Sequence, residues 1–217
     1  MKVALIGYRP WAIDIYENIS KEFSEFCYHK VYSEDEFNEE SLNSFDPDVV
    51  LFYGWSKIIP LRVVSKFKCL MLHPSPLPKY RGGSPIQNQI IRGETESAVT
   101  VFIMDEGIDT GDIVGQRKMS LLGDIPDIFD RMSRIGLEIT KDFLLGKYQV
   151  VKQDQSESTY FKRRTPDQSE ITFEELKESS GSYLYNKIRM LTGPYPCAYI
   201  KTVDGKKILL KNAELID

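Results

Sequence analysis

The sequence is poor in the residues that bind metals and form covalent cross-links. Its 217 residues include only two histidines and three cysteines. The cysteines, Cys27, Cys69 and Cys197, are scattered without the spacing of a metal site, so we expect no bound metal. We interpret them as free buried thiols, which are typical of proteins from a reducing compartment.

Long apolar runs and an excess of positive charge are also missing. No apolar stretch approaches the roughly 20 residues that a membrane span requires, and the first residues lack the pattern of a secretory signal peptide. The net charge is -4 and the pI about 5.4, so the overall charge does not attract a polyanion such as RNA. We therefore expect a cytoplasmic protein that binds neither membranes nor nucleic acid.

The remaining composition is that of an ordinary globular protein. Hydrophobic residues make up 41% of the chain and charged residues 28%. A chain of 217 residues can form one full domain plus a small appendage. We place the boundary after residue 152, with a catalytic domain over 1–152. A polar linker, a helix and a truncated β-hairpin follow over 153–217.

Apolar strands and helices alternate in the first half of the chain. Apolar patterns predict the following elements: strands at 3–6, 26–31, 48–53 and 69–72, and helices at 10–19, 34–45 and 61–66. This alternation indicates a parallel sheet with right-handed crossovers. Ligands bind such sheets beyond the carboxyl ends of the strands, where Gly7, Gly54 and His73 fall.

The second half is expected to add two strands, a long helix and a hairpin. The predicted elements are strands at 98–104 and 113–119, an amphipathic helix at 126–145, a linker at 152–170, a helix at 183–191 and hairpin strands at 198–202 and 207–211. The predicted fold is α/β, with a mostly parallel, Rossmann-like sheet flanked by helices. A small helix and β-hairpin form a C-terminal appendage.

Two loops carry residues suited to proton transfer. In LMLHPSPLPKYRGGSPIQ, His73 directly follows a strand, the prolines stiffen the loop, and Gly82 and Gly83 allow the backbone a close approach. The second loop, DEGIDTGD, carries four carboxylates, those of Asp105, Glu106, Asp109 and Asp112. Alone, an isolated histidine is more often a packed residue and an acidic turn is more often solvated. Together they offer an imidazole and a carboxylate that can orient it or relay its proton.

The order HPSPLPKYRGGSPIQ and then MDEGIDTGDI resembles the formyltransferase family that uses 10-formyltetrahydrofolate. The resemblance runs from MKVALIGYRPW to PYPCAYIKTVDGKKI, most of the chain. Family members include methionyl-tRNA formyltransferase, glycinamide ribonucleotide formyltransferase and sugar-nucleotide N-formyltransferases. The resemblance implies the formyltransferase fold, 10-formyltetrahydrofolate as co-substrate without a metal, and His73 and Asp109 as the catalytic histidine and aspartate.

The resemblance also implies where the two substrates bind. The pterin pocket would be lined by Trp55, Ser56, Lys57, Ile58, Met104, Asp105, Glu106 and Gly107. Candidates for contacts to the small-molecule acceptor are Tyr8, Arg9, Lys79, Tyr80, Arg81, Gly82, Gly83 and Ser84. For Tyr80 and Arg81, packing within the loop is an equally good interpretation.

One position departs from the family pattern. Family members usually carry Asn-x-His-x-Ser, in which the asparagine helps to hold the formyl oxygen, and this chain has Met71 there. A thioether cannot donate a hydrogen bond, and the loss of one such donor typically lowers kcat by about 10²–10³. Gln87, Asn88 or a bound water could replace the asparagine. Otherwise the enzyme would be slower, or the chain would bind ligands without transferring the formyl group.

The predicted acceptor is the amino group of a nucleotide-linked amino sugar used in surface polysaccharide synthesis. The acidic charge, and what looks like one hairpin in place of a full C-terminal barrel, argue against methionyl-tRNA. GYRPW also lacks the phosphate loop of the glycinamide ribonucleotide enzymes. The alternatives are methionyl-tRNA or an amino acid as acceptor, or a weakened protein that binds folate or a nucleotide sugar.

Two further features concern partners. The short cluster Lys162–Arg164 is explained equally well by a solvated linker, a phosphate contact or RNA. The strands of the C-terminal hairpin have edges that could pair across a homodimer.

Overall fold

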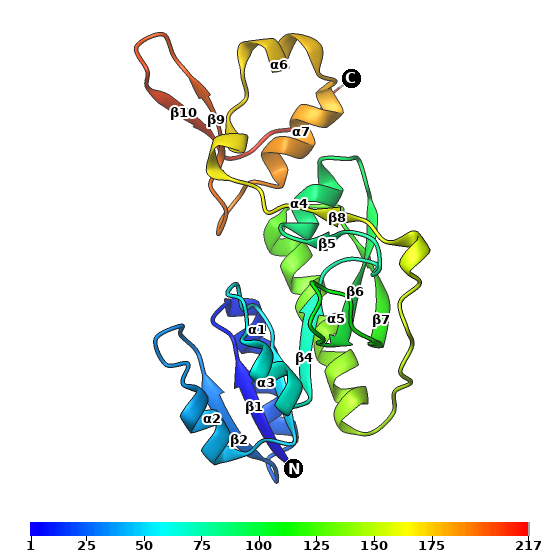
Figure 1. Cartoon of the computed structure of the whole chain (residues 1–217). Coiled ribbons are helices and arrows are strands. Elements are labelled where there is room, and N and C mark those ends of the chain that lie inside the picture. Colours follow the sequence, from blue (N-terminus) through cyan, green and yellow to red (C-terminus); the bar gives the residue numbers. More distant parts are fainter. Residues whose placement is uncertain (217) are drawn as a thin grey trace.

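The computed structural model describes residues 1–216 and contains a six-stranded central sheet, whose arrangement can be followed in Figure 1. Its strands are β1 (Lys2–Ile6), β2 (Cys27–Val31), β3 (Val49–Phe52), β4 (Cys69–His73), β6 (Glu96–Ile103) and β7 (Ile113–Ser120). They lie in the order β2-β1-β3-β4-β6-β7. The first four are mutually parallel, and β6 is antiparallel to both of its neighbours. The predicted mostly parallel sheet is therefore confirmed.

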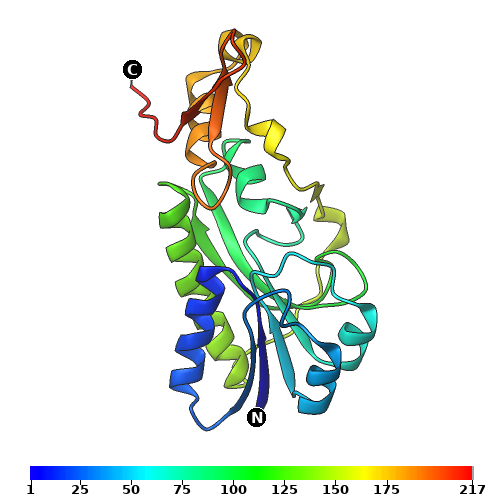
Figure 2. The ribbon, with the colours of Figure 1, turned by 90° about the vertical axis from the view of Figure 1, so that its left-hand side faces the viewer.

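Helices cover both faces of the sheet (Figure 2). One face carries α1 (Pro10–Glu22) and α5 (Ile125–Leu144), and the other carries α2 (Glu39–Phe45) and α3 (Leu61–Lys66). The alternation of side chains along a strand produces this division: Val3 and Leu5 join the larger apolar core, whereas Ala4 and Ile6 join the smaller one on the opposite face. Apolar side chains on both faces are what a doubly covered sheet requires.

The ends of the two long helices follow from local chemistry. Pro10 occupies the first turn of α1, where a missing backbone donor costs nothing. At the start of α5, the carboxylate of Asp124 accepts from the backbone N–H of Asp127, and the carboxylate of Asp127 accepts from the backbone N–H of Asp124. Both helices begin within one residue of the predicted position.

Several short elements were not predicted. They are β5 (Arg81–Gly82), α4 (Pro85–Ile90), β8 (Tyr160–Phe161), α6 (Phe173–Glu178) and two 3-10 turns at Gln155–Glu157 and Pro166–Ser169. The linker is thus more structured than expected: β8 pairs in parallel with β5, placing Tyr160 beside Arg81. The predicted helix at 34–45 was also too long, since α2 begins at Glu39 behind the cap of Asn38.

The C-terminal part consists of α6, α7 (Gly181–Arg189) and the hairpin of β9 (Ala198–Lys201) and β10 (Lys207–Leu210). The predicted helix and hairpin are confirmed, whereas pairing of the hairpin across a homodimer stays a prediction. Met190, Leu191 and Ala198 continue the larger core of the sheet, so the boundary at residue 152 also stays a prediction. No helix within residues 1–216 is long and apolar enough to cross a membrane.

Candidate functional site

His73 ends β4 and is enclosed by two loops. Its side chain is buried, and Nδ1 lies 3.5 Å from Oδ2 of Asp109. On the other side of the ring, Nε2 lies 2.8 Å from the carbonyl oxygen of Tyr80. The structure therefore brings together the histidine and the aspartate that the two sequence motifs single out, although 36 positions separate them along the chain.

The carbonyl of Tyr80 determines which nitrogen of the neutral His73 ring carries the proton. A carbonyl oxygen only accepts hydrogen bonds, so Nε2 of His73 donates to it. Nδ1 then faces the carboxylate of Asp109 and is the nitrogen that can gain or lose a proton. In this ring orientation Tyr80, and not Asp109, sets the tautomer. Asp109 instead faces Nδ1, the nitrogen left free to act as a base.

Asp109 itself is held in a strained position. Its φ of 55° is left-handed, a conformation that aspartate tolerates better than most residues. Oδ2 accepts from the backbone nitrogen of Gly82 at 2.8 Å. The side-chain amide of Gln153 donates to the carbonyls of Asp109, at 2.9 Å, and Gly111, at 2.7 Å. Asp105 closes the same turn by accepting from Gly107 and Thr110.

The proline-rich loop after His73 is fastened from outside. Three side chains donate to loop carbonyls: Gln89 to Pro74 at 2.9 Å, Thr100 to Ser75 at 2.6 Å and Gln116 to Leu77 at 3.0 Å. Prolines cannot donate to a neighbouring strand, so these side chains satisfy carbonyls that no sheet partner reaches. The histidine consequently sits on a rigid support.

Arg81 is buried rather than directed to solvent. Its Nε and Nη2 donate to Oε1 of Gln153 at 3.1 and 2.6 Å, and its Nη1 donates to Gln155 at 2.9 Å. Gln153 therefore links the guanidinium of Arg81 to the loop of Asp109. These three bonds favour packing within the loop, and a contact of Arg81 with the acceptor stays a prediction.

Two of the residues expected to line a pterin pocket, Trp55 and Met104, form with Met71 a partly exposed apolar edge of the smaller core. Met71, Met104 and Trp55 all pack against that core, and the ring of Trp55 contacts that of Tyr8 at a centroid distance of 5.5 Å. Ile58 is 98% exposed on the same loop. Four further expected residues also lie at the surface: Lys57, which pairs with Glu34, and Asp105, Glu106 and Gly107 in the acidic turn.

The candidates to replace the missing asparagine differ in their bonding. Both hydrogens of the Asn88 amide are engaged, by the carbonyls of Gly83 at 2.8 Å and Lys162 at 3.3 Å, so Asn88 is not free to donate elsewhere. The amide of Gln87 is buried, and within residues 1–216 it has no hydrogen-bond partner. Burial raises the pKa of the nearby Tyr195 hydroxyl, and the Gln87 amide opposes part of that rise.

The residues expected to contact the acceptor have several kinds of partner within the chain. Lys79 pairs with Glu157, and the hydroxyl of Tyr80 donates to Glu94 while its ring stacks on Phe161. Arg9 lies over the ring of Tyr8 and lines a cavity of about 410 Å³ with Trp11, Phe129 and Tyr195. The Oγ of Ser84 accepts from the backbone nitrogen of Arg164 at 3.1 Å.

Gly82 and Gly83 approach the chain itself. A Cβ on Gly82 would lie 2.3 Å from the carbonyl oxygen of Phe161, and one on Gly83 would lie 2.4 Å from Cα of Arg163. The sequence correctly indicated a close backbone approach here, but not what comes close. That neighbour is β8 and the residues after it.

Sequence reasoning missed the glutamines that hold the site. Gln89, Gln116 and Gln153 each bond to a loop that carries the site, yet glutamine has no spacing that distinguishes such a role from an exposed one. Among the described residues, no group of three His, Cys, Asp or Glu side chains is arranged to hold a metal ion.

Comparison with known proteins places these features in one family. The model of the formyl transferase family matches residues 16–132. The chain is 35% identical to the methionyl-tRNA formyltransferase of Lachnospira eligens over 193 residues, which cover 84% of this chain and 59% of that protein. The chain therefore spans little more than half the length of the curated relatives it matches.

Solved structures agree with the fold. A methionyl-tRNA formyltransferase from Clostridium thermocellum has a TM-score of 0.86 and 33% identity, with 96% of each chain covered. A 4-N formyltransferase from Francisella tularensis has a TM-score of 0.80 and 21% identity, covering 100% of this chain and 98% of that one. HypX from Aquifex aeolicus, solved with tetrahydrofolic acid, has a TM-score of 0.79 and 20% identity, covering 98% of this chain and 37% of HypX.

Proposed function

This chain belongs to the formyl transferase family, and from that premise we propose that it transfers a formyl group from 10-formyltetrahydrofolate to a primary amine. The observation that carries the proposal is the buried pair of His73 and Asp109 at the end of β4. The proposal is supported by the position of this pair. Nδ1 of His73 can exchange a proton beside a carboxylate, and it lies at the carboxyl end of a parallel strand, where ligands of α/β proteins bind.

In the proposed reaction, Nδ1 of His73 first accepts a proton and later returns it. The acceptor nitrogen attacks the formyl carbon and gives up a proton, which Nδ1 of His73 accepts. Asp109 stabilises the resulting imidazolium through its charge. The tetrahedral intermediate collapses as the bond from carbon to N10 of the folate breaks, and N10 takes the proton back from His73. The backbone bond from Gly82 keeps the carboxylate of Asp109 in place throughout.

We propose that the folate binds against the apolar edge formed by Trp55, Met71 and Met104. These side chains offer surface to a flat heterocycle, and the backbone of Asp105 to Gly107 lies in an exposed turn that can bond to its polar rim. The neighbour solved with tetrahydrofolic acid supports this class of co-substrate. Met71 supplies no donor for the formyl oxygen, so the reaction depends more heavily on His73.

For the acceptor, we propose the amine of a nucleotide-linked amino sugar, and methionyl-tRNA as the second candidate. The net charge of -4 favours the first because RNA binding draws its affinity from positive charge. The second is favoured by the relatives named methionyl-tRNA formyltransferases, at 33% and 35% identity.

The test is turnover with a panel of amines. Purified protein is mixed with 10-formyltetrahydrofolate and with dTDP-, UDP- or GDP-linked amino sugars, methionyl-tRNA or free methionine, and the release of tetrahydrofolate is followed by absorbance. We expect turnover with an amino sugar. Folate binding without turnover on any amine would contradict the proposed activity, and turnover on methionyl-tRNA alone would replace the acceptor.

The roles of the two site residues have matched controls. His73→Ala and Asp109→Ala are expected to abolish turnover while the protein stays folded, as judged by circular dichroism. The controls are His29→Ala, which changes the other histidine, on β2, and Asp35→Ala, which removes an exposed carboxylate. Retained activity in either site variant would refute the assignment.

A further inference from the structure

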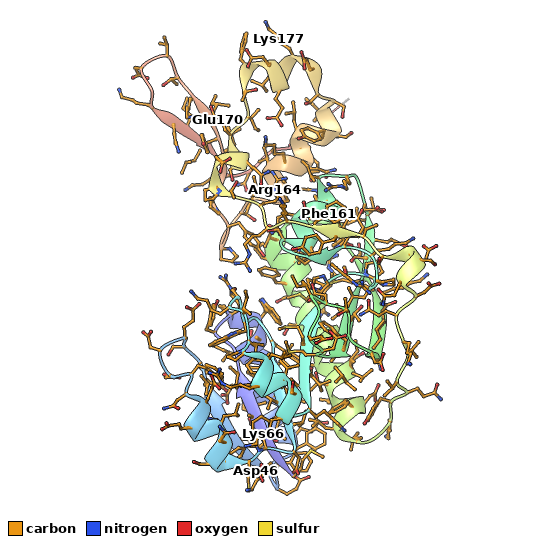
Figure 3. All side chains as sticks on the ribbon, in the orientation of Figure 1. Asp46, Lys66, Phe161, Arg164, Glu170 and Lys177 are labelled. Carbon is orange, nitrogen blue, oxygen red and sulfur yellow. The ribbon has the colours of Figure 1, made fainter. Side chains whose placement is uncertain are left out.

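Four cationic side chains converge on one cavity outside the site of His73. The cavity has a volume of about 470 Å³ and is lined by Asn88, Ile91, Arg92, Phe161, Lys162, Arg163, Arg164, Gln168 and Tyr183. We call it the cationic cavity. It lies where α4, β8 and the C-terminal part meet, and Phe161 and Arg164 mark it in Figure 3.

The positive charge of the cationic cavity is not balanced by carboxylates. Within residues 1–216, none of its four cations forms an ion pair within 4.0 Å. Glu175 is nearby, but its carboxylate is bound by Lys187. Burial lowers the pKa of Arg164 and the like charge of Arg92 adds to that fall, while Tyr183 and Glu175 oppose it without reversing it. Like charges held this close repel each other, and a bound anion relieves that repulsion.

Two of the arginines are fixed before any ligand arrives. The guanidinium of Arg92 lies 4.1 Å from the ring centre of Phe161 and donates to the carbonyl of Asn88 at 2.8 Å. Arg164 donates to the carbonyl of Gln168 at 3.0 Å. Side chains already held in place lose less freedom when they bind a ligand. Lys162 and Arg163 are exposed at the cavity, as is Arg92, whereas Arg164 is half-buried.

The cationic cavity and the candidate catalytic site share one short stretch of backbone. Gly82 donates to the carboxylate of Asp109. The next residue, Gly83, donates to the carbonyl of Phe161 at 2.8 Å and packs against the backbone of Arg163. An acceptor anchored in the cavity is therefore held by residues adjacent to those that hold Asp109.

We propose that the cationic cavity binds the diphosphate of a nucleotide-linked acceptor and so positions its amine for the reaction at His73. The inference rests on the proposed function for the identity of the acceptor. A single concave cavity with four cations fits a compact group with several negative charges, and arginine can bind two phosphate oxygens at once. An RNA backbone is instead followed by cations spread along a groove, which the net charge of -4 does not favour.

The test measures binding without any chemistry. Titration calorimetry with UDP, dTDP, GDP and inorganic pyrophosphate compares the unchanged protein with Lys162→Ala/Arg163→Ala. The matched control is Lys118→Ala/Lys147→Ala, which removes the same charge from exposed positions elsewhere. We expect the dissociation constant of at least one diphosphate to rise roughly 10- to 100-fold for each charge-assisted hydrogen bond that the substitution removes. The control should leave it unchanged, and added salt should weaken binding.

Each result decides the inference. Equal diphosphate affinity in the cavity variant and the control overturns it, as does a failure of all four diphosphates to bind. Affinity only for an RNA acceptor-stem hairpin, abolished in the cavity variant, also overturns it in favour of a nucleic-acid site. Arg163→Lys should retain part of the affinity, since it keeps the charge.

The two proposals fail in different ways. If no amine is formylated, but the unchanged protein binds diphosphate and the cavity variant does not, the proposed transfer fails and the binding site stands. If an amino sugar is formylated with unchanged KM in the cavity variant, the transfer stands and the binding site fails.

Discussion

Replacing Gln153 by alanine tests whether one buried amide holds the candidate catalytic loop. Gln153 is 7% exposed and makes four bonds: its amide donates to the carbonyls of Asp109 and Gly111, and its oxygen accepts twice from Arg81. The substitution removes all four. It leaves two loop carbonyls without a donor and the guanidinium of Arg81 with Gln155 as its remaining partner.

The expected cost follows from this geometry. A buried polar group left without its partner costs about 1–3 kcal/mol, and a charged one costs more. Water that enters the vacated space offsets part of this, so we expect a loss of about 2–4 kcal/mol in the free energy of unfolding. For a domain of this size, each kcal/mol corresponds to a fall of roughly 2–4 °C in Tm.

Activity should fall through kcat rather than through binding. Without Gln153, the backbone of Asp109 loses an anchor beside a left-handed φ of 55°, so the carboxylate no longer faces Nδ1 of His73 in every molecule. Thermal unfolding and initial rates at saturating folate measure the two effects. Gln155→Ala, which removes one partly buried bond to Arg81, is the control and should cost about 0.5–1.5 kcal/mol.

A charged variant separates anchoring from charge balance. Gln153→Glu keeps the size and strengthens the contact with Arg81, but it points a carboxylate at the carbonyls of Asp109 and Gly111. We expect the free energy of unfolding to fall less in this variant than in the alanine variant, while kcat stays low. A Gln153→Ala protein with unchanged Tm and unchanged kcat would refute the reasoning.

Three further predictions concern other parts of the chain. Met71→Asn restores a donor beside the expected formyl oxygen and should raise kcat by about 10²–10³; an unchanged rate would mean that another group already fills the role. Gly83→Ala places a Cβ 2.4 Å from Cα of Arg163, which should cost about 1–3 kcal/mol in chemical unfolding and weaken diphosphate binding; unchanged values of both would contradict the close approach. Burial raises the pKa of the Cys69 thiol to about 12, so at pH 8 a thiol reagent should modify exposed Cys27 and leave Cys69 intact until the protein unfolds, and equal reaction rates would contradict its burial.

The main strands and helices could be predicted because runs or stripes of apolar residues determine them. The strand at 69–73 is a short apolar run buried on both faces and the helix at 125–144 buries one apolar stripe, and each was predicted to within one residue at either end. The resemblance of the two sequence motifs to the family pattern indicated His73 and Asp109 as partners, and the structure brings Nδ1 and Oδ2 within 3.5 Å.

The missed elements are defined by contacts between distant residues. β5 and β8 have two residues each and exist only because Arg81 and Tyr160 meet across the fold. Two residues carry no periodicity, and a polar linker does not reveal which loop it will pair with. The same holds for Gln153, whose partners Arg81 and Asp109 are distant in sequence.

Because β5 pairs with β8, the segment that follows α5 and the loop of residues 70–87 depend on each other for their structure. Residues 153–164 supply the side-chain amide that donates to the carbonyl of Asp109 and the strand that pairs with Gly82. They also supply three of the four cations of the cationic cavity. An exchange of loop 70–87 between members of this family should therefore work only when 153–164 is exchanged with it. These two stretches form one transplantable unit, although sixty-five residues lie between them.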